Sequence, residues 1–180
     1  MKRLLAAALF AWSALAGAVD LEKPLILVAK PDLRDPLYSS SVLVVAPLGA
    51  GQHVGFIVNR PTGWALDKVS EPVYLGGPVQ PARIFALVQR RTTPGGNSFE
   101  LAPGLYAAYE PHVVDRIIES EARQARFMAG LVAWRAGELK QELEAGAWYV
   151  LEPDAALLGR KSEGLWEELV RRAQRIRNTS

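Results

Sequence analysis

The stretch Val73-Tyr74-Leu75-Gly76-Gly77-Pro78-Val79-Gln80-Pro81 decides the fold, because it separates two apolar, strand-forming runs by a Gly-Gly-Pro break. Two consecutive glycines permit a positive φ or the close approach of another segment. The two prolines fix φ, remove backbone donors and keep the residues before them out of helical geometry. The stretch therefore predicts a stiff, sharp bend between a strand that ends near Leu75 and a second strand at 84–88.

This bend has two interpretations, and the sequence leaves both open. In the first, the glycines and prolines only allow an awkward sheet to close. In the second, the bend is a rigid rim whose unpaired backbone N–H groups bind an anionic or polar group, with help from the nearby Arg83. The second interpretation makes Gly76, Gly77, Pro78 and Arg83 candidate binding residues.

Residues 1–18 have the parts of a secretory signal. The basic pair Lys2-Arg3 precedes a short apolar run, and Ala16-Gly17-Ala18 is a small-residue cleavage site. We expect cleavage at this site and an exported, periplasmic protein consisting of one domain, residues 19–180. The alternatives are an uncleaved N-terminal anchor and, if the start codon is misassigned, a cytoplasmic protein. No later stretch is apolar enough over its length to predict a transmembrane span.

The composition is that of a folded domain without a nucleic-acid footprint. The chain has 180 residues, of which 49% are hydrophobic and 22% charged. Two of its 21 basic residues lie in the signal segment, which leaves 19 against 19 acidic residues in the body. A net-neutral body lacks the basic surface that nucleic acid requires, so a nucleic-acid partner is not expected for the exported form. The chain has no cysteine, which excludes disulfides and thiolate chemistry.

Apolar runs and turn residues predict an irregular mixture of strands and helices. We expect strands at 25–29, 42–46, 53–58, 73–75, 84–88, 127–134 and 148–151, with the second and third forming a hairpin. We expect helices at 111–122, 137–145 and 163–176. Residues 64–69 are interpreted as one helical turn, and 101–108 remains ambiguous because Pro103-Gly104 interrupts it. This mixture predicts a single α+β domain.

Side chains that could carry catalysis are scattered. His53 and His112 are isolated from one another and are interpreted as surface or capping residues. The serines at 39–41 lack the glycines of a nucleophile elbow. Asp32 and Asp35 form an acidic pair, but they lie on either side of a turn in which Asp is common. We expect neither a metal nor a cofactor, and the sequence indicates no catalytic residue.

Four segments resemble the AlgH/YqgE-like family of bacterial proteins. They are 29–38 with its Asp-Pro pair, 54–61 with Asn59-Arg60-Pro61, 74–79 with the Gly-Gly-Pro bend, and 130–139 with Trp134, which is followed by Gly146-Ala147-Trp148. The resemblance covers roughly residues 24–158. It implies an α+β fold with a bifurcated, barrel-like, mostly antiparallel β-sheet flanked by helices. It implies no activity, because the family's biochemical activity is not established, although some members have been regarded as transcriptional regulators.

The chain departs from the family pattern in four respects. It begins with a signal segment, whereas the usual members are cytoplasmic. Ser40 occupies a position where many members have Arg, Glu138 follows the last motif in place of Gln, and the segment between residues 62 and 73 is short. An exported protein cannot reach the chromosome, so transcriptional regulation is expected only if the protein is not exported.

The leading hypothesis is a non-enzymatic binding or regulatory module for an unknown protein or a small polar or anionic ligand. The candidate binding residues, whose loops are expected to meet at one end of the sheet, are Asp35, Asn59, Arg60, Gly76, Gly77, Pro78, Arg83 and Trp134. An enzyme of unrecognised type that uses Asp32, Asp35, Asn59 and Arg60 is a second hypothesis. A purely structural role is the alternative for each motif residue, with Trp134 and Trp148 in the core.

Overall fold

The computed structural model describes residues 19–179, so the predicted signal segment lies outside the described residues. The strands are β1 (Leu25–Ala29), β2 (Val42–Gly49), β3 (Gln52–Ile57), β4 (Pro61–Ala65), β5 (Pro72–Leu75), β6 (Val79–Gln89), β7 (Ser98–Ala102), β8 (Leu105–Ala108), β9 (Ala125–Trp134) and β10 (Trp148–Leu151). The helices are α1 (Pro111–Ser120), α2 (Glu138–Glu144) and α3 (Leu165–Thr179), with short 3₁₀ turns at Ala122–Gln124 and Ala155–Gly159. No helix in this part of the chain is long and apolar enough to cross a membrane.

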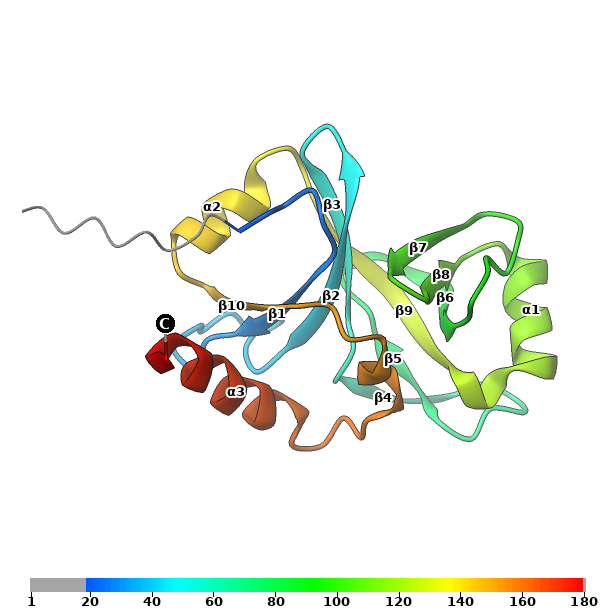
Figure 1. Ribbon diagram of the computed structural model, residues 1–180. Coiled ribbons are helices and arrows are strands. Elements are labelled where there is room, and N and C mark those ends of the chain that lie inside the picture. The colour runs from blue at the N-terminus through cyan, green and yellow to red at the C-terminus, as the bar shows by residue number, and fades with distance from the viewer. Residues whose placement is uncertain (1–18, 180) are drawn as a thin grey trace, which may run out of the picture.

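The strands form one curled, mostly antiparallel sheet (Figure 1). Its order is β10-β1-β2-β3-β9-β6-β8-β7, and every neighbouring pair along this path is antiparallel. The strands β4 and β5 lie off the path as an antiparallel pair, and β5 pairs in parallel with β9. The predicted single-domain, barrel-like α+β architecture is confirmed.

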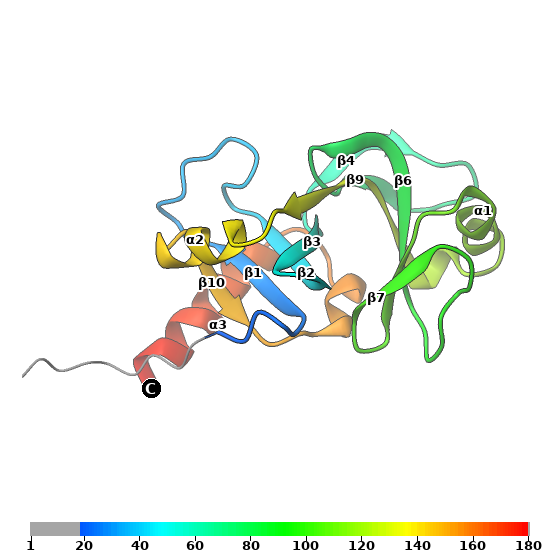
Figure 2. The ribbon, with the colours of Figure 1, turned by 90° about the horizontal axis from the view of Figure 1, so that it is seen from above.

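The sheet divides at β9, which has two neighbours along one edge. Its last residues, Val132 to Trp134, pair with β3, whereas Met128 and Ala129 pair with β5. β6 pairs along the opposite edge of β9, so β3 and β5 share one edge. The sheet therefore splits near Gly130 into a branch that continues through β3 and a branch that continues through β5. Figure 2 shows β9 running between the half that contains β10, β1, β2 and β3 and the half that contains β6 and β7. This split is the bifurcation that the family resemblance implied.

Helices cover both faces of one half of the sheet and one face of the other. In β1, Ile26 and Val28 share a core cluster with residues of α3, whereas Leu25 and Leu27 share one with Leu139 of α2. Burial on both faces explains why this strand is apolar throughout rather than alternating. Figure 1 shows α2 and α3 on either side of β10 and β1, and α1 beside the half that contains β6 and β8. A third cluster lies beneath α1.

One stretch differs from its prediction and another was left ambiguous by the sequence, and strand pairing explains both. The helical turn predicted at 64–69 is wrong, because Pro61–Ala65 forms β4 and the Thr62 hydroxyl donates a hydrogen bond to the Val73 carbonyl, 2.7 Å away. The ambiguous stretch at 101–108 is a hairpin of β7 and β8 that turns at Gly104, where φ is +74°. The remaining strands and helices lie within a few residues of their predicted limits, except that β6 begins at Val79.

Candidate functional site

The Gly-Gly-Pro bend is the point where the two branches of the sheet touch. The Gly76 N–H donates a hydrogen bond to the Ala129 carbonyl at 2.8 Å, and the Gly76 carbonyl accepts one from Ile57 at 2.9 Å. A Cβ on Gly76 would overlap the carbonyl of Gly130, and one on Gly77 would overlap the backbone of Leu131. Both glycines are buried. The hypothesis that Gly76 offers an unpaired N–H to an anion is therefore wrong, and its role is to permit close backbone contact.

Asn59 and Arg60 support the loop that precedes β2. The Asn59 side chain accepts a hydrogen bond from the Val42 N–H at 2.8 Å and donates one to the Ser40 carbonyl at 2.9 Å. The Arg60 guanidinium donates to the Ser39 carbonyl at 2.9 Å. In an irregular loop, backbone groups lack strand partners. Both side chains supply hydrogen bonds to such groups, which would otherwise need water.

Asp35 belongs to the same loop and stabilises its turn. Its carboxylate accepts hydrogen bonds from the backbone N–H groups of Leu37 and Tyr38 at 2.8 and 3.0 Å, the usual contacts of an Asp that starts a turn. Burial raises the pKa of the neighbouring Tyr38 hydroxyl, and the nearby carboxylates of Glu142 and Asp35 raise it further.

Asp35 thus lies in the loop that the Asn59 and Arg60 side chains support, and a 2.8 Å hydrogen bond from the Leu75 N–H to the Arg60 carbonyl joins this cluster to the bend. Their polar groups are engaged with backbone, which makes this cluster a support for the loop. Asp32 is exposed and makes none of these contacts.

Trp134 and Trp148 are buried in the core and do not lie at the surface. Trp134 is 4% exposed, in the core cluster beneath α2, and the prediction that it lines a surface is wrong. Trp148 also lies in this cluster at 5% exposure, so the structural alternative is confirmed for both residues.

The two histidines differ in exposure. His53 is 3% exposed and hydrogen-bonds to the Leu21 carbonyl, which corrects its interpretation as a surface residue. His112 lies at the exposed start of α1.

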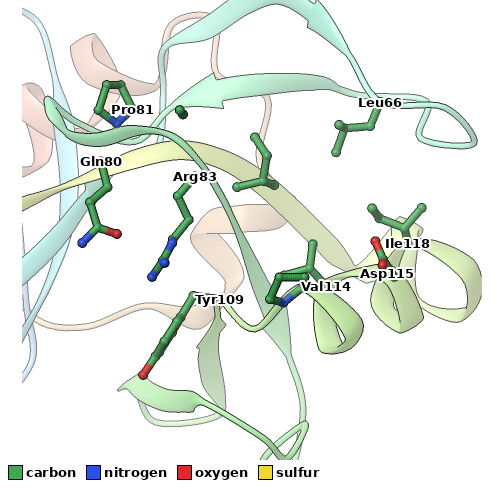
Figure 3. A pocket seen from close by; sticks show the side chains of 11 residues that line it. Leu66, Gln80, Pro81, Arg83, Tyr109, Val114, Asp115 and Ile118 are labelled. Carbon is green, nitrogen blue, oxygen red and sulfur yellow. The ribbon is translucent and has the colours of Figure 1, made fainter.

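Arg83 lies in a groove between β6 and α1, which we call the β6–α1 groove (Figure 3). Its volume is about 650 Å³. The residues that line it are Leu66, Gln80, Pro81, Ala82, Arg83, Ile84, Tyr109, Pro111, Val114, Asp115 and Ile118. None of Asp35, Asn59 and Arg60 is among the residues that line this groove. The predicted site therefore divides into a loop support and a separate groove that contains Arg83.

The wall of the β6–α1 groove is mainly apolar, and it carries one charge of each sign. Figure 3 shows Arg83 beside Tyr109 at one side, and Asp115 beside Ile118 at the other. The Arg83 guanidinium carbon lies 5.9 Å from the centre of the Tyr109 ring, within range of a cation–π contact. Within residues 19–179, neither Arg83 nor Asp115 has an ion-pair partner within 4.0 Å. Both charges are therefore available to a ligand.

The rim of this groove is built by the end of the bend. From Pro78 to Arg83 the chain is exposed, and Gln80 has a φ of +53°, a conformation that non-glycine residues seldom adopt. Residues held in such conformations cluster at binding sites. Pro81 follows directly and limits how far this backbone can relax.

The sequence motifs indicated Arg83 but not the groove residues on α1 and just before it. Tyr109 and Asp115 come from the segment around α1, and nothing in the motifs connected them with the bend. One signal was available, because the apolar stripe of α1 extends to Ile118, which is only half-buried. In the part of the chain that the structure describes, no group of three or more histidine or acidic side chains is placed to hold a metal ion.

Comparison with known proteins identifies the family. A family model described as AlgH-like (DUF179) matches residues 26–176. The chain belongs to the AlgH-like family. Among AlgH-like relatives, it is 29% identical over 157 residues to a UPF0301 protein of Chlorobaculum tepidum, which covers 81% of this chain and 83% of that one. It is 31% identical over 166 residues to a UPF0301 protein of Streptomyces avermitilis, which covers 82% and 84% of the two chains.

Two solved structures share this AlgH-like fold. The crystal structure of a Corynebacterium diphtheriae protein matches with a TM-score of 0.70 at 21% identity, covering 86% of this chain and 88% of that one. The solution structure of the AlgH protein from Pseudomonas aeruginosa matches with a TM-score of 0.70 at 23% identity, covering 84% and 87%. At these identities the matches establish the fold alone.

Proposed function

We propose that this AlgH-like protein is an exported, non-enzymatic binding module, and that its β6–α1 groove takes an extended segment of a partner protein. The segment carries an apolar side chain next to an acidic one. The observation that carries this proposal is the apolar groove with Arg83 at one side, since within residues 19–179 no carboxylate lies within 4.0 Å of this guanidinium. The groove's volume of about 650 Å³ is in the usual range for ligand sites.

The open edge of β6 supports a peptide rather than a compact ligand. β8 pairs with β6 only over residues 86–89, so residues 79–85 carry no strand on that side. An extended peptide can add to such an edge through main-chain hydrogen bonds, while its side chains enter neighbouring pockets. Pro81 lacks an N–H, which limits the pairing to a short stretch and leaves selectivity to the side chains.

Charge complementarity defines the sequence that the groove prefers. Arg83 favours an acidic residue of the partner, and Leu66, Ile84 and Ile118 favour an apolar residue beside it. Asp115 favours a basic group further along the segment. Asp35, Asn59 and Arg60, which the enzyme hypothesis proposed for catalysis, hydrogen-bond to backbone and support the loop before β2, so their contacts favour a structural role over a catalytic one.

A charge reversal tests the groove. Selection from a random peptide library should enrich segments with an acidic residue beside an apolar one. The Arg83→Glu variant should bind a selected peptide about tenfold or more weakly, because an attractive charge contact becomes a repulsive one. The same variant should enrich basic residues at that peptide position. Fluorescence anisotropy with the labelled peptide measures the affinities.

Arg91→Glu is the matched control for this experiment, since it makes the same charge change at an exposed residue that does not line the groove. It should bind like the wild type. If both variants lost the same affinity for the peptide, the loss would come from the change in net charge and not from the groove. A library selection without enrichment would reject the peptide proposal.

Export is the second part of the proposal, and it rests on the signal pattern of residues 1–18. Mass spectrometry of the protein isolated from its native cells should find a mature chain that begins at Val19, in the periplasmic fraction. A membrane-bound chain that retains residues 1–18 would indicate an uncleaved anchor. A cytoplasmic chain would overturn export and reopen the role in transcriptional regulation that has been suggested for family members.

A further inference from the structure

Arg126 of β9 is a charged side chain in the protein interior. It is 2% exposed and is among the largest fully buried side chains. Its Nη1 donates a hydrogen bond to the Val58 carbonyl at 2.8 Å, and its Nη2 donates one to the Arg160 carbonyl at 2.9 Å. The Tyr74 ring lies against the guanidinium, with 4.3 Å between the ring centre and Cζ. Removing a guanidinium from water is costly, so its remaining contacts determine whether this charge is compensated.

These contacts leave the charge of Arg126 poorly compensated. Carbonyl oxygens accept hydrogen bonds but carry no net charge, and the buried Nε–H has no hydrogen-bond acceptor. Within the described residues, the carboxylate within 4.0 Å of it is that of Glu71, at 3.6 Å, which is too long for a hydrogen bond. The Glu71 side chain is 56% exposed, so it can turn into solvent at little cost.

The Glu71 carboxylate lies at the side of a recess with a volume of about 340 Å³, which we call the Arg126 recess. Its wall contains Arg126, Lys161 and Ser162 together with Glu71 and Glu163. Arg160 also lines it, but its guanidinium is paired with Asp154 and Glu168, at 3.6 and 2.8 Å. The recess is therefore polar, and Arg126, whose buried Nε–H lacks an acceptor, is among the residues that line it.

We propose that the Arg126 recess binds a small oxyanion, a carboxylate or phosphate group, which accepts a hydrogen bond from the Arg126 Nε–H and displaces the Glu71 carboxylate. A bound oxyanion can approach the guanidinium to the 2.7–2.9 Å of a charge-assisted hydrogen bond, a distance that Glu71 does not reach. Lys161 and the Ser162 hydroxyl line the same recess and supply further donors. This site shares no residue with the β6–α1 groove, so it is independent of the peptide proposal.

A purely structural role of Arg126 makes a different prediction. In that role the side chain only links the end of β3 to the segment before α3, through the carbonyls of Val58 and Arg160. Such a link needs no ligand at Nε, and removing the Glu71 carboxylate would then leave anion binding unchanged. The two roles are separated by how the Nε–H responds to an added anion.

The experiment follows the arginine Nε–H signals of the full folded protein by ¹H–¹⁵N NMR during titration with inorganic phosphate, and separately with acetate. Sodium chloride keeps the ionic strength constant. The Arg126 Nε–H signal should shift in a saturable manner with at least one of the two anions. In Glu71→Gln, the dissociation constant should fall about two- to fivefold, because the competing exposed carboxylate is gone. The anion that saturates the signal distinguishes a carboxylate site from a phosphate site.

Glu167→Gln is the matched control, because it removes one negative charge from an exposed position of α3 outside the recess. It should titrate like the wild type. A signal that shifts only linearly with both anions, in wild type and Glu71→Gln alike, would overturn the site. Equal dissociation constants in the two proteins would overturn the displacement of Glu71.

Discussion

Replacing Gly76 by alanine is expected to destabilise the protein by about 4 kcal/mol or more, a loss at the extreme end for single substitutions. The added methyl group would overlap the Gly130 carbonyl and approach the Met128 side chain, and the first of these is backbone that cannot move without separating β5 from β9. Domains of this size are stable by only about 5–15 kcal/mol, so the variant should be partly or wholly unfolded at 37 °C. Urea denaturation followed by circular dichroism measures the loss.

The matched control is Gly63→Ala in β4, where an added Cβ would meet no atom within 4 Å. This substitution should change stability by less than about 1 kcal/mol, since it adds a side chain in open space and reduces the freedom of the unfolded chain. If Gly76→Ala were as stable as Gly63→Ala, the contact between the two branches of the sheet would not be tight, and the bend could again be considered as a binding rim.

The bend illustrates what local sequence can predict. The run of Gly76, Gly77 and Pro78 predicts a break between strands because the residues themselves restrict or free the backbone. It does not identify the segment that comes close to the bend. That segment contains Gly130, more than fifty positions along the chain, where φ is +72° inside a strand. The reason for this second glycine becomes visible only when β5 and β9 are paired.

The same holds for the candidate site, where some contacts follow from local sequence and others depend on the fold. The contacts of Asp35 lie within its own turn and follow from its type and position. Asn59 and Arg60 act on carbonyls and N–H groups about twenty residues away, so their role as loop supports required the pairing of β2 and β3 to be known. The β6–α1 groove depends on where α1 lies relative to β6, which no motif in the chain specifies.

The burial of Arg126 shows most clearly what local sequence cannot predict. The strand predicted at 127–134 starts one residue after it, and an arginine at the end of a strand is ordinarily interpreted as exposed. Its burial results from three partners that come from separate parts of the chain: the Val58 carbonyl, the Tyr74 ring and the Arg160 carbonyl. A charged residue in the interior is favoured by none of the local rules, and such exceptions are expected at functional positions.

Replacing Trp134 by alanine is expected to destabilise the protein by about 3–5 kcal/mol, the usual cost of deleting a large buried ring. Trp134 is 4% exposed, and a Cβ placed on Gly55 of the neighbouring strand would lie 3.0 Å from its ring, so the ring fills the space above that glycine. Its deletion leaves a cavity that the paired strands β3 and β9 cannot close. Urea denaturation monitored by circular dichroism gives the free energy of unfolding.

Trp64→Ala separates this packing effect from the loss of a tryptophan as such. Trp64 is 62% exposed on β4, so its deletion should change stability by no more than about 0.5 kcal/mol. A Trp134→Ala protein as stable as Trp64→Ala would mean that the Trp134 ring is not packed in the core, and would return it to the list of surface residues available for binding. If the large loss is found, any weakening of peptide affinity in Trp134→Ala reflects the unfolded fraction, because this ring does not line the β6–α1 groove.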